Sequence, residues 1–386
     1  MVKMSIKTKR SEGEKMYIWL GSIILTVFLF TRIPTVKKSI HVRNSFLVKK
    51  CSIIIPARNE ELTIGNLLSS IQKQFIQPFE VIVVNDGSKD RTKAIAEEFG
   101  ATVVDTPPLP NGWNGKSWAC WNGAEASKGE FLLFVDSDTW FEQAGLLRIC
   151  ETYQQQQCQG VLSIHPFHKM NSGYETLSMM FHLIVFASTS VTHLLSGLVR
   201  PSGGFGQCFL CTRDVYQRIG GHEAIKGDMV ENFALSQRAK KCGELVVAAS
   251  GSNAISMRMY GNGLSELFYG WSKSFASGAK STNIILLVLS SLWITSLASF
   301  VIHSPVMVWT DPYIYMIQYF SLSIYLYLIL SRIGNFTIIE TLLFPVHILF
   351  FVMTFSHSVF TTFLTKNTKW KDRYIYLEKG KDEKMK

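Results

Sequence analysis

The sequence predicts an α/β domain with a mostly parallel sheet, joined to transmembrane helices. Between residues 51 and 245, short apolar runs bounded by turn residues alternate with stretches whose apolar residues recur at helical spacing. This alternation is typical of strand–helix–strand units whose sheet is covered on both faces. Long apolar blocks lie before and after this part of the chain. Because one core rarely grows beyond ~250–300 residues, the 386 residues accommodate one such domain and a membrane section.

The charge of the chain is unevenly placed. Lys and Arg number 39 against 29 Asp and Glu, a formal net charge of +10. The basic residues crowd beside apolar blocks, with five in residues 1–16, six in 32–50 and eight in 366–386. This placement favours a lipid headgroup surface over nucleic acid, for which the sequence carries no binding motif.

The seven cysteines form neither a disulfide nor a zinc pattern. Their number is odd, and the lone Cys-x-x-Cys, Cys208 and Cys211, lies in an apolar run without a second pair. We therefore expect reduced cysteines in an intracellular catalytic domain.

Residues 1–50 are predicted to form a membrane anchor and a basic linker. The apolar block Tyr17–Ile33 approaches the ~17–25 residues that cross a bilayer. A signal peptide is the alternative, because a basic segment precedes the block. The sequence TRIPTVKK that follows has no small-x-small cleavage pattern, so an uncleaved anchor is preferred.

The elements of the α/β domain are predicted in order. Four buried strands are expected at 51–56, 79–84, 101–105 and 131–136. Helices are expected from Ile64 to Phe75 and from about Asp90 to Gly100, and a third follows the Gly, Asn and Trp-rich loop 111–115. Ligands of such sheets bind at the carboxyl ends of the strands. The polar residues directly after each strand are therefore the candidates for the site.

A transmembrane region is predicted at 283–365, before the basic tail 366–386. Its apolar blocks are Ile284–His303, Tyr313–Leu330 and Thr341–Leu364, each long enough to span a bilayer. A further stretch, 177–195, contains two His and several Ser and Thr. It could be a span, a re-entrant element or an interfacial helix, and the interfacial helix is favoured.

The strongest chemical motif is Asp136-Ser137-Asp138, which directly follows an apolar strand. Two carboxylates at one strand end can hold a hard cation, and Mg²⁺ or Mn²⁺ held there can stabilise a departing diphosphate. A lone Asp-x-Asp is common, so this prediction depends on its place in the predicted sheet.

Two other strand ends carry polar residues. After the second strand comes Asn85-Asp86-Gly87-Ser88, where Asp86 can accept hydrogen bonds from a base or ribose. After the first comes Pro56-Ala57-Arg58-Asn59-Glu60, where Arg58 can meet phosphate and Glu60 ribose or base. Taken alone, either segment would be a turn that begins a helix.

Together, SIIIPARNE, VIVVNDGSKD and FLLFVDSD resemble the family 2 glycosyltransferases, whose catalytic domain has the Rossmann-like GT-A fold. The order and spacing agree over roughly 51–245, and we expect a GT-A domain at 51–282. The resemblance implies that a UDP-sugar donor and a divalent cation, Mg²⁺ or Mn²⁺, bind here. It implies metal binding by Asp136 and Asp138, and donor binding by Pro56, Ala57, Arg58, Glu60, Asp86, Lys116, Asp136 and Ser137.

The same resemblance marks an acceptor side. The segment 203–222, with Gly204 and Gln207, is similar to the acceptor-side loop of the family. Where the family has a Glu-Asp pair whose Asp acts as base, this chain has Glu231-Asn232. Either Glu231 or Asp228 replaces the missing base, or none is needed. A carboxylic acid acceptor, with a pKa near ~4, is already ionised and needs no base.

A closer resemblance, to bacterial diapocarotenoid glycosyltransferases, covers most of the chain after about residue 50. It rests on residues 258–279, on 177–195 and on the apolar C-terminal half. Trp271 is expected to stack on acceptor or sugar, and Lys273 or Arg258 to neutralise diphosphate. The alternative for this segment is an interfacial helix anchored by its aromatic and basic residues.

The two resemblances, with Asn232 in place of the usual base, imply an inverting enzyme that glycosylates the carboxylate of a membrane-resident carotenoid acid. The expected setting is the cell membrane, multi-pass, with the catalytic domain facing the cytoplasm. The alternative is a lipid or polyprenyl-phosphate glycosyltransferase of cell-envelope glycan synthesis, while a polysaccharide synthase or a non-catalytic scaffold fits less well. One anchor and three spans would leave the basic tail outside, against the positive-inside tendency. The block 341–364, which contains Pro345, is therefore the candidate for a re-entrant element.

Overall fold

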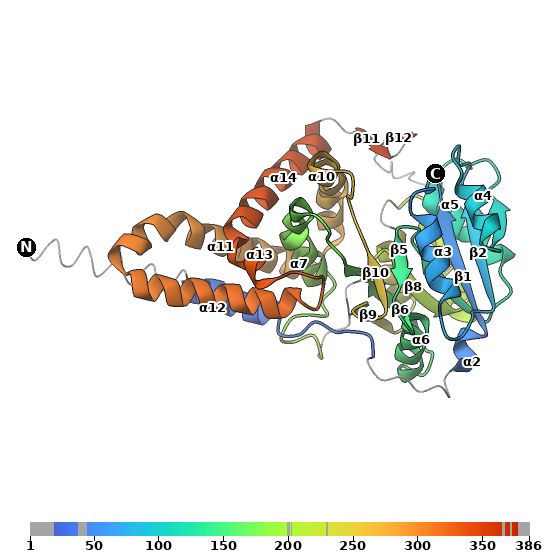
Figure 1. The fold of residues 1–386 in the computed structure, drawn as a ribbon, viewed down its shortest axis with the longest axis horizontal. Coiled ribbons are helices and arrows are strands. Elements are labelled where there is room, and N and C mark those ends of the chain that lie inside the picture. The colour runs from blue at the N-terminus through green and yellow to red at the C-terminus, as the bar shows by residue number, and fades with distance from the viewer. Residues whose placement is uncertain are drawn as a thin grey trace, which may run out of the picture.

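The computed structural model describes residues 19–37, 45–198, 201, 203–228, 231–364, 367–370 and 373–376. Within these ranges, side chains at 45, 232, 273–281 and after 361 are outside the description. The predicted segments 1–18 and 377–386 also lie outside it. Figure 1 shows an α/β domain at one end and a group of long helices at the other.

The α/β domain is built on a seven-stranded sheet. Its strands, in spatial order, are β3 (Thr102–Asp105), β2 (Glu80–Asn85), β1 (Cys51–Ala57), β4 (Phe131–Val135), β8 (Cys208–Thr212), β6 (Val161–His165) and β9 (Val246–Ser250). The pairs from β3 to β4 and the pair β6–β9 are parallel, whereas β8 runs antiparallel to β4 and β6. The sheet is therefore mixed, and the four predicted strands are its parallel part.

Helices cover both faces of this sheet, because its strands are apolar on both sides. One face packs against α2 (Ser45–Val48), α3 (Ile64–Gln72), α4 (Thr92–Glu98) and α6 (Gly145–Gln155). The other packs against α5 (Gly115–Ala126), α8 (Arg213–Arg218), the 3₁₀ helix η3 (His222–Ile225) and α9 (Glu231–Lys241). Chain order reverses on either side of β1, so the ends of β1 and β4 flank the point where ligands bind in such sheets.

A three-stranded sheet joins this domain to the helical part. It contains β5 (Thr139–Phe141), β10 (Ile255–Met257) and β7 (Phe167–His168). The 3₁₀ helix η2 (Gly173–Ser178) and helix α7 (Met179–Ser188) follow β7, and α10 (Leu264–Ser281) follows β10. A two-stranded sheet of β11 (Asn367–Trp370) and β12 (Arg373–Tyr376) comes last.

Three helices are long and apolar enough to cross a membrane: α11 (Ile284–Thr310), α12 (Pro312–Leu330) and α14 (Phe344–Leu364). A shorter apolar helix, Trp19–Leu29, packs beside them, and Trp293 Nε1 donates to Thr26 Oγ1 at 2.8 Å. The short helix α13 (Ile338–Leu342) precedes α14. Pro345 lies in the first turn of α14, a position where proline is tolerated.

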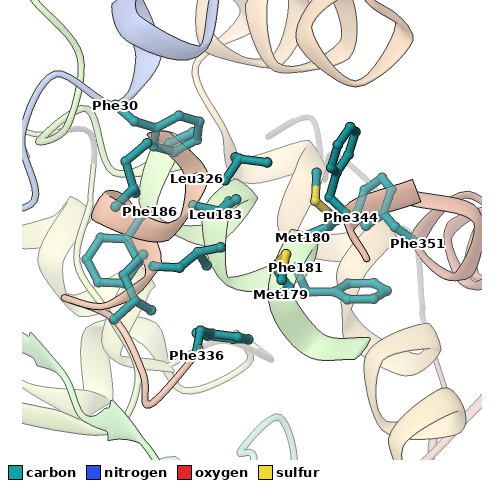
Figure 2. Close-up of a cluster of buried hydrophobic side chains, with 14 of the residues drawn as sticks. Phe30, Met179, Met180, Phe181, Leu183, Phe186, Leu326, Phe336, Phe344 and Phe351 are labelled. Atoms are coloured by element: carbon teal, nitrogen blue, oxygen red, sulfur yellow. The ribbon is translucent and has the colours of Figure 1, made fainter. Parts of the chain in front are cut away.

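Helix α7 lies at the centre of the helical part, unlike the interfacial helix favoured for 177–195. Phe181, Leu183 and Phe186 are fully buried, and Figure 2 shows them among side chains from α12 and α14 and Phe30, which directly follows the N-terminal helix. An interfacial helix would keep one face open to headgroups. In α7 the buried residues instead extend around the helix, because the surrounding helices cover it.

Ser250 connects the domain to the helical part through three hydrogen bonds. Ser250, at the end of β9, donates its N–H to the carbonyl of Pro34 and accepts from Val36 N–H. Its Oγ donates to the carbonyl of Arg332 at 2.6 Å. Pro34 follows the N-terminal helix and Arg332 follows α12, so the ends of two helices meet at one strand of the sheet.

Candidate active site

All eight residues predicted to bind the donor, together with Asp138, surround one cavity of about 190 Å³, here called the polar cavity. They come from the ends of β1, β2 and β4 and from the first turn of α5. The complete lining is Pro56, Ala57, Arg58, Glu60, Asp86, Gly115, Lys116, Ala119, Asp136, Ser137 and Asp138. The carboxylates at 86, 136 and 138, which the sequence assigns to one pocket, therefore share this space.

Lys116 joins two acids at the edge of the polar cavity. Its Nζ lies 2.8 Å from Asp136 Oδ1 and 2.5 Å from Glu231 Oε1. Burial lowers the pKa of Lys116, but the charges of Asp136 and Glu231 outweigh burial and hold that pKa well above its usual value. Glu231 is thus engaged as the partner of a cation, and it lines neither of the two cavities described in this section.

Arg58 is paired with Asp86. Its Nη1 donates to the Asp86 carbonyl at 2.6 Å and lies 3.6 Å from Asp86 Oδ2, with both side chains largely buried. Thr106 Oγ1 also approaches Asp86 Oδ1 at 3.4 Å. Arg58 therefore fixes the orientation of Asp86, and Lys116 is the cation nearest to the Asp136 carboxylate.

The acidic groups fit a divalent cation. Burial raises the pKa of Asp136 to about 7, and the charges of Asp138 and Glu231 add to this effect although Lys116 opposes it. Hard carboxylate oxygens crowded in this way are the ligands that Mg²⁺ and Mn²⁺ prefer. Among the described residues, no three His, Cys, Asp or Glu side chains gather around one point. The protein thus offers two carboxylates of Asp136 and Asp138, and a substrate oxygen would have to complete the shell.

A second and larger cavity, of about 430 Å³, lies between the domain and the helices and is here called the apolar cavity. Its floor is the loop Gly204–Gln207, and its walls come from α7, α10, α11 and α14. Apolar side chains predominate, among them Val185, Phe205, Trp271, Ile294, Phe351 and Phe355.

The two cavities adjoin. The backbone N–H of Asp136 donates to the carbonyl of Gln207 at 3.0 Å, across the antiparallel pair β4–β8. Tyr260, which lines the apolar cavity, is near enough to Asp138 for that charge to add to burial in raising the pKa of its phenol. A group at the inner end of the apolar cavity therefore stands beside the two aspartates.

Only some of the predicted acceptor-side residues line the apolar cavity. Gly204, Gln207 and Trp271 line the apolar cavity, where Trp271 stacks on Phe181 with ring centroids 4.7 Å apart. Trp271 is only 7% exposed, so it lies in a cavity wall and not on an open helix face. Lys273 has its side chain outside the described residues.

Two other predicted residues are not found in either cavity. Arg258 was expected near the diphosphate, but its Nη2 lies 2.6 Å from Glu175 Oε1. Because Glu175 is fully buried, its charge needs this partner. Asp228, a candidate base, is exposed and also lines neither cavity.

Sequence reasoning missed a row of three buried histidines at the junction of the domain and α7. His165 Nδ1 lies 2.8 Å from the Pro166 carbonyl, His182 Nδ1 lies 3.3 Å from His165 Nε2, and His168 Nδ1 lies 2.9 Å from His182 Nε2. Burial lowers the pKa of all three rings, so they are neutral. Because a carbonyl can only accept, His165 Nδ1 carries its proton, and the Nδ1 atoms of His182 and His168 then donate along the row. Burial accordingly lowers the pKa of His165 to about 4. Only the spacing His-x-x-His at 165–168 hinted at this row.

Comparison with known proteins agrees with this geometry. The sequence model of glycosyl transferase family 2 matches residues 52–220. A 4,4'-diaponeurosporenoate glycosyltransferase from Staphylococcus haemolyticus is 34% identical over 347 residues, which cover 87% of this chain and 91% of that protein. The chain belongs to the family 2 glycosyltransferases. A 4,4'-diaponeurosporenoate glycosyltransferase from Staphylococcus aureus is 32% identical over 344 residues, 87% of this chain and 90% of that protein.

The fold of this family 2 glycosyltransferase also has a solved counterpart. A mannosyltransferase from Pyrobaculum calidifontis, in complex with GDP-Man and Mn²⁺, superposes with a TM-score of 0.52 and 12% identity. The match covers 93% of this chain and 97% of that one. At this identity the likeness concerns the fold alone, a GT-A domain with additional helices.

Proposed function

We propose that this glycosyltransferase transfers a sugar, glucose in the simplest case, from a UDP-sugar to the carboxylate of a membrane-resident carotenoid acid such as 4,4'-diaponeurosporenoate. The observation that carries the proposal is the adjacency of the two cavities. A polar cavity rich in carboxylates suits a metal-bound nucleotide sugar, and an apolar cavity of about 430 Å³ suits a long hydrocarbon. The names of the relatives supply the acceptor class.

The donor is assigned to the polar cavity. Glu60 and Asp86 contact the nucleoside, and Asp136 and Asp138 would hold Mg²⁺ or Mn²⁺ beside the diphosphate. The bound cation supplies charge stabilisation for the departing diphosphate. Lys116, at 2.8 Å from Asp136, is the protein's own cation for the same task. Because the acceptor approaches from the adjoining cavity, on the side away from the diphosphate, the displacement inverts the anomeric carbon.

The acceptor class is supported by the state of the candidate bases. Glu231 is paired with Lys116 at 2.5 Å, and Asp228 is exposed. Neither lines the apolar cavity, as far as the described residues go. A hydroxyl acceptor would need a base to remove its proton, and His165, which lines the cavity, has both ring nitrogens engaged in hydrogen bonds. A carboxylate attacks as an anion without that help. The arrangement therefore favours an acid over an alcohol.

The helices support an arrangement in which the C-terminus lies on the same side as the catalytic domain. The chain after α12 contacts the domain, where Met170 N–H donates to Asn335 Oδ1 at 2.8 Å. Tyr319 then bonds to the Leu342 carbonyl of α13. Tyr319 lies 11 residues before the end of α12, or about 17 Å along it, near half of the ~30 Å thickness of a bilayer core. The segment α13 thus enters only to mid-depth.

Helix α14 then returns toward the domain. His357 packs on Phe268 with ring centroids 5.1 Å apart, and Phe268 lies near the start of α10, close to β10. Ser358 Oγ donates to the Ser272 carbonyl at 2.5 Å. We take α13 and α14 as a re-entrant pair, which leaves the tail 366–386 and the catalytic domain together on the cytoplasmic side. This arrangement agrees with the positive-inside tendency.

The function is tested with membranes that contain the protein, UDP-glucose and Mn²⁺. Separate reactions receive 4,4'-diaponeurosporenoate, the corresponding carotenoid alcohol, or undecaprenyl phosphate. A glycosyl ester formed from the acid, and removed by mild alkali, is the expected product. Transfer only to the alcohol, or only to the phosphate, would refute the proposed acceptor.

A further inference from the structure

Gln207 places an uncommitted amide at the inner end of the apolar cavity. No hydrogen bond from the described residues reaches its side chain, and its Oε1 is buried without a partner. Most buried polar atoms are bonded, and leaving one unpaired is costly. The amide oxygen and nitrogen exchange places by a half-turn about the last side-chain bond. A ligand that forms a hydrogen bond with this amide would therefore remove the free-energy cost of leaving it unpaired.

Tyr260 is held at the same end in a strained conformation. Its φ of 60° lies in the left-handed region, which is rare for a bulky side chain. The ring packs on Gly270 and meets Trp271 edge-on at 5.9 Å. Its phenol receives no hydrogen bond from the part of the chain that the structure describes. Strain of this kind persists where the surrounding structure needs the side chain in that place.

Three other polar residues around the apolar cavity are already engaged by hydrogen bonds. His165 donates through Nδ1 to the Pro166 carbonyl, and its Nε2 accepts from His182. The hydroxyls of Ser291 and Thr295 donate to carbonyls of their own helix, at 2.8 Å each. Among the residues that line the apolar cavity, Gln207 lies beside Asp136 through a backbone hydrogen bond, and Tyr260 lies near enough to Asp138 to feel its charge.

We propose that Gln207 and Tyr260 bind the acceptor's carboxylate and make the enzyme prefer an acid to an alcohol. This inference rests on the proposed function. An ionised carboxylate only accepts hydrogen bonds, so an amide N–H and a phenol O–H match it. One carboxylate oxygen forms the bond to the anomeric carbon, the bond to the diphosphate oxygen breaks, and its electron pair leaves with UDP. No proton has to move, and the two donors orient the anion without quenching it.

The test compares three variants with the wild type on the acid and on the alcohol. Tyr260→Phe and Gln207→Met each remove one donor, and we expect kcat/KM for the acid to fall about 10- to 100-fold. Gln207→Glu puts a carboxylate against the acceptor's carboxylate, so the preference should shift toward the alcohol. Binding of UDP-glucose with Mn²⁺, measured by calorimetry, should stay within about threefold of the wild type, because the polar cavity is untouched.

Gln318→Met is the matched control. Gln318 lies in α12 outside both cavities, and its Oε1 is likewise buried without a partner among the described residues. Its substitution should leave the ratio of acid to alcohol unchanged. The inference is overturned if all three site variants keep the wild-type ratio while their UDP-glucose binding is intact. Failure of the proposed function looks different, because the wild type itself would then leave the acid unmodified.

Discussion

Replacement of Gly270 by alanine tests whether the position of Tyr260 governs the acceptor. A Cβ built at residue 270 would lie 2.1 Å from Tyr260 Cε1, 2.7 Å from Cζ and 2.9 Å from Cδ1. Ordinary carbon contacts are about 3.5–4.0 Å, so the ring must move by more than an ångström. Trp271 borders the ring on α10, so we expect the ring to leave its place in the cavity wall.

Two effects oppose each other in the stability of Gly270→Ala. Alanine in a helix interior is favoured over glycine by about 1 kcal/mol, whereas overpacking costs about 1–3 kcal/mol. We expect a net loss of about 0–2 kcal/mol in the free energy of unfolding. The effect on turnover should be larger, because a displaced phenol no longer meets the carboxylate. Loss of one bond to a charged group corresponds to a fall of about 10- to 100-fold in kcat/KM for the acid.

The assay measures kcat/KM for the carotenoid acid, affinity for UDP-glucose with Mn²⁺, and the melting temperature in detergent. Gly21→Ala is the control, because Gly21 lies in the N-terminal helix with no heavy atom within 4 Å of an added Cβ. It should leave acceptor kinetics unchanged. Gly270→Ala with wild-type kinetics for the acid would show that the ring position does not matter to the acceptor.

Four further outcomes are expected. Asp138→Ala should abolish turnover and weaken Mn²⁺ binding measured by electron paramagnetic resonance, and undiminished Mn²⁺ affinity would argue against a metal ligand at 138. Asn232→Ala should cost less than about threefold in kcat, and a severe loss would reveal an essential role at that position. The melting temperature should fall as pH drops from 6.5 toward 4, because His165 takes up a proton in the unfolded chain but stays neutral in the folded chain, where its pKa is about 4; no fall in the wild type, or an equal fall in His165→Asn, would contradict this. A reporter that is active only in the cytoplasm, fused after Lys386, should be active, and its silence would refute the re-entrant arrangement.

The strands and the polar cavity could be predicted from sequence because their signals are local. Four apolar runs became β1 to β4 with shifts of a residue or so at their ends. Strand ends of a parallel sheet meet at one edge, so Asp86 and Asp136 had to come close once the strands were correct. The antiparallel direction of β8 could not be predicted in this way, because an apolar run does not indicate whether a strand is parallel or antiparallel to its neighbours.

The acceptor side could not be read in the same way. Arg258 resembled a free cation in the sequence, but its partner Glu175 is 83 residues away and buried. The segment 177–195 has the composition of an interfacial helix, and only the helices packed around Phe181 bury it. The strain at Tyr260 depends on the space left by Gly270, a tertiary contact. Each of these features depends on tertiary contacts with residues distant in the sequence.

The junction at Ser250 also fixes the position of the catalytic aspartates relative to the apolar helices. Its hydrogen bonds to Pro34, Val36 and Arg332 join the sheet to the ends of two helices. Movement of the aspartates along those helices would therefore break these hydrogen bonds. In a bilayer, the catalytic site would then lie at a fixed distance from the hydrocarbon. Amphiphiles would be sorted by how far their polar end projects from the hydrocarbon, a criterion separate from the chemistry of that end. A chain ending too deep would never meet the sugar.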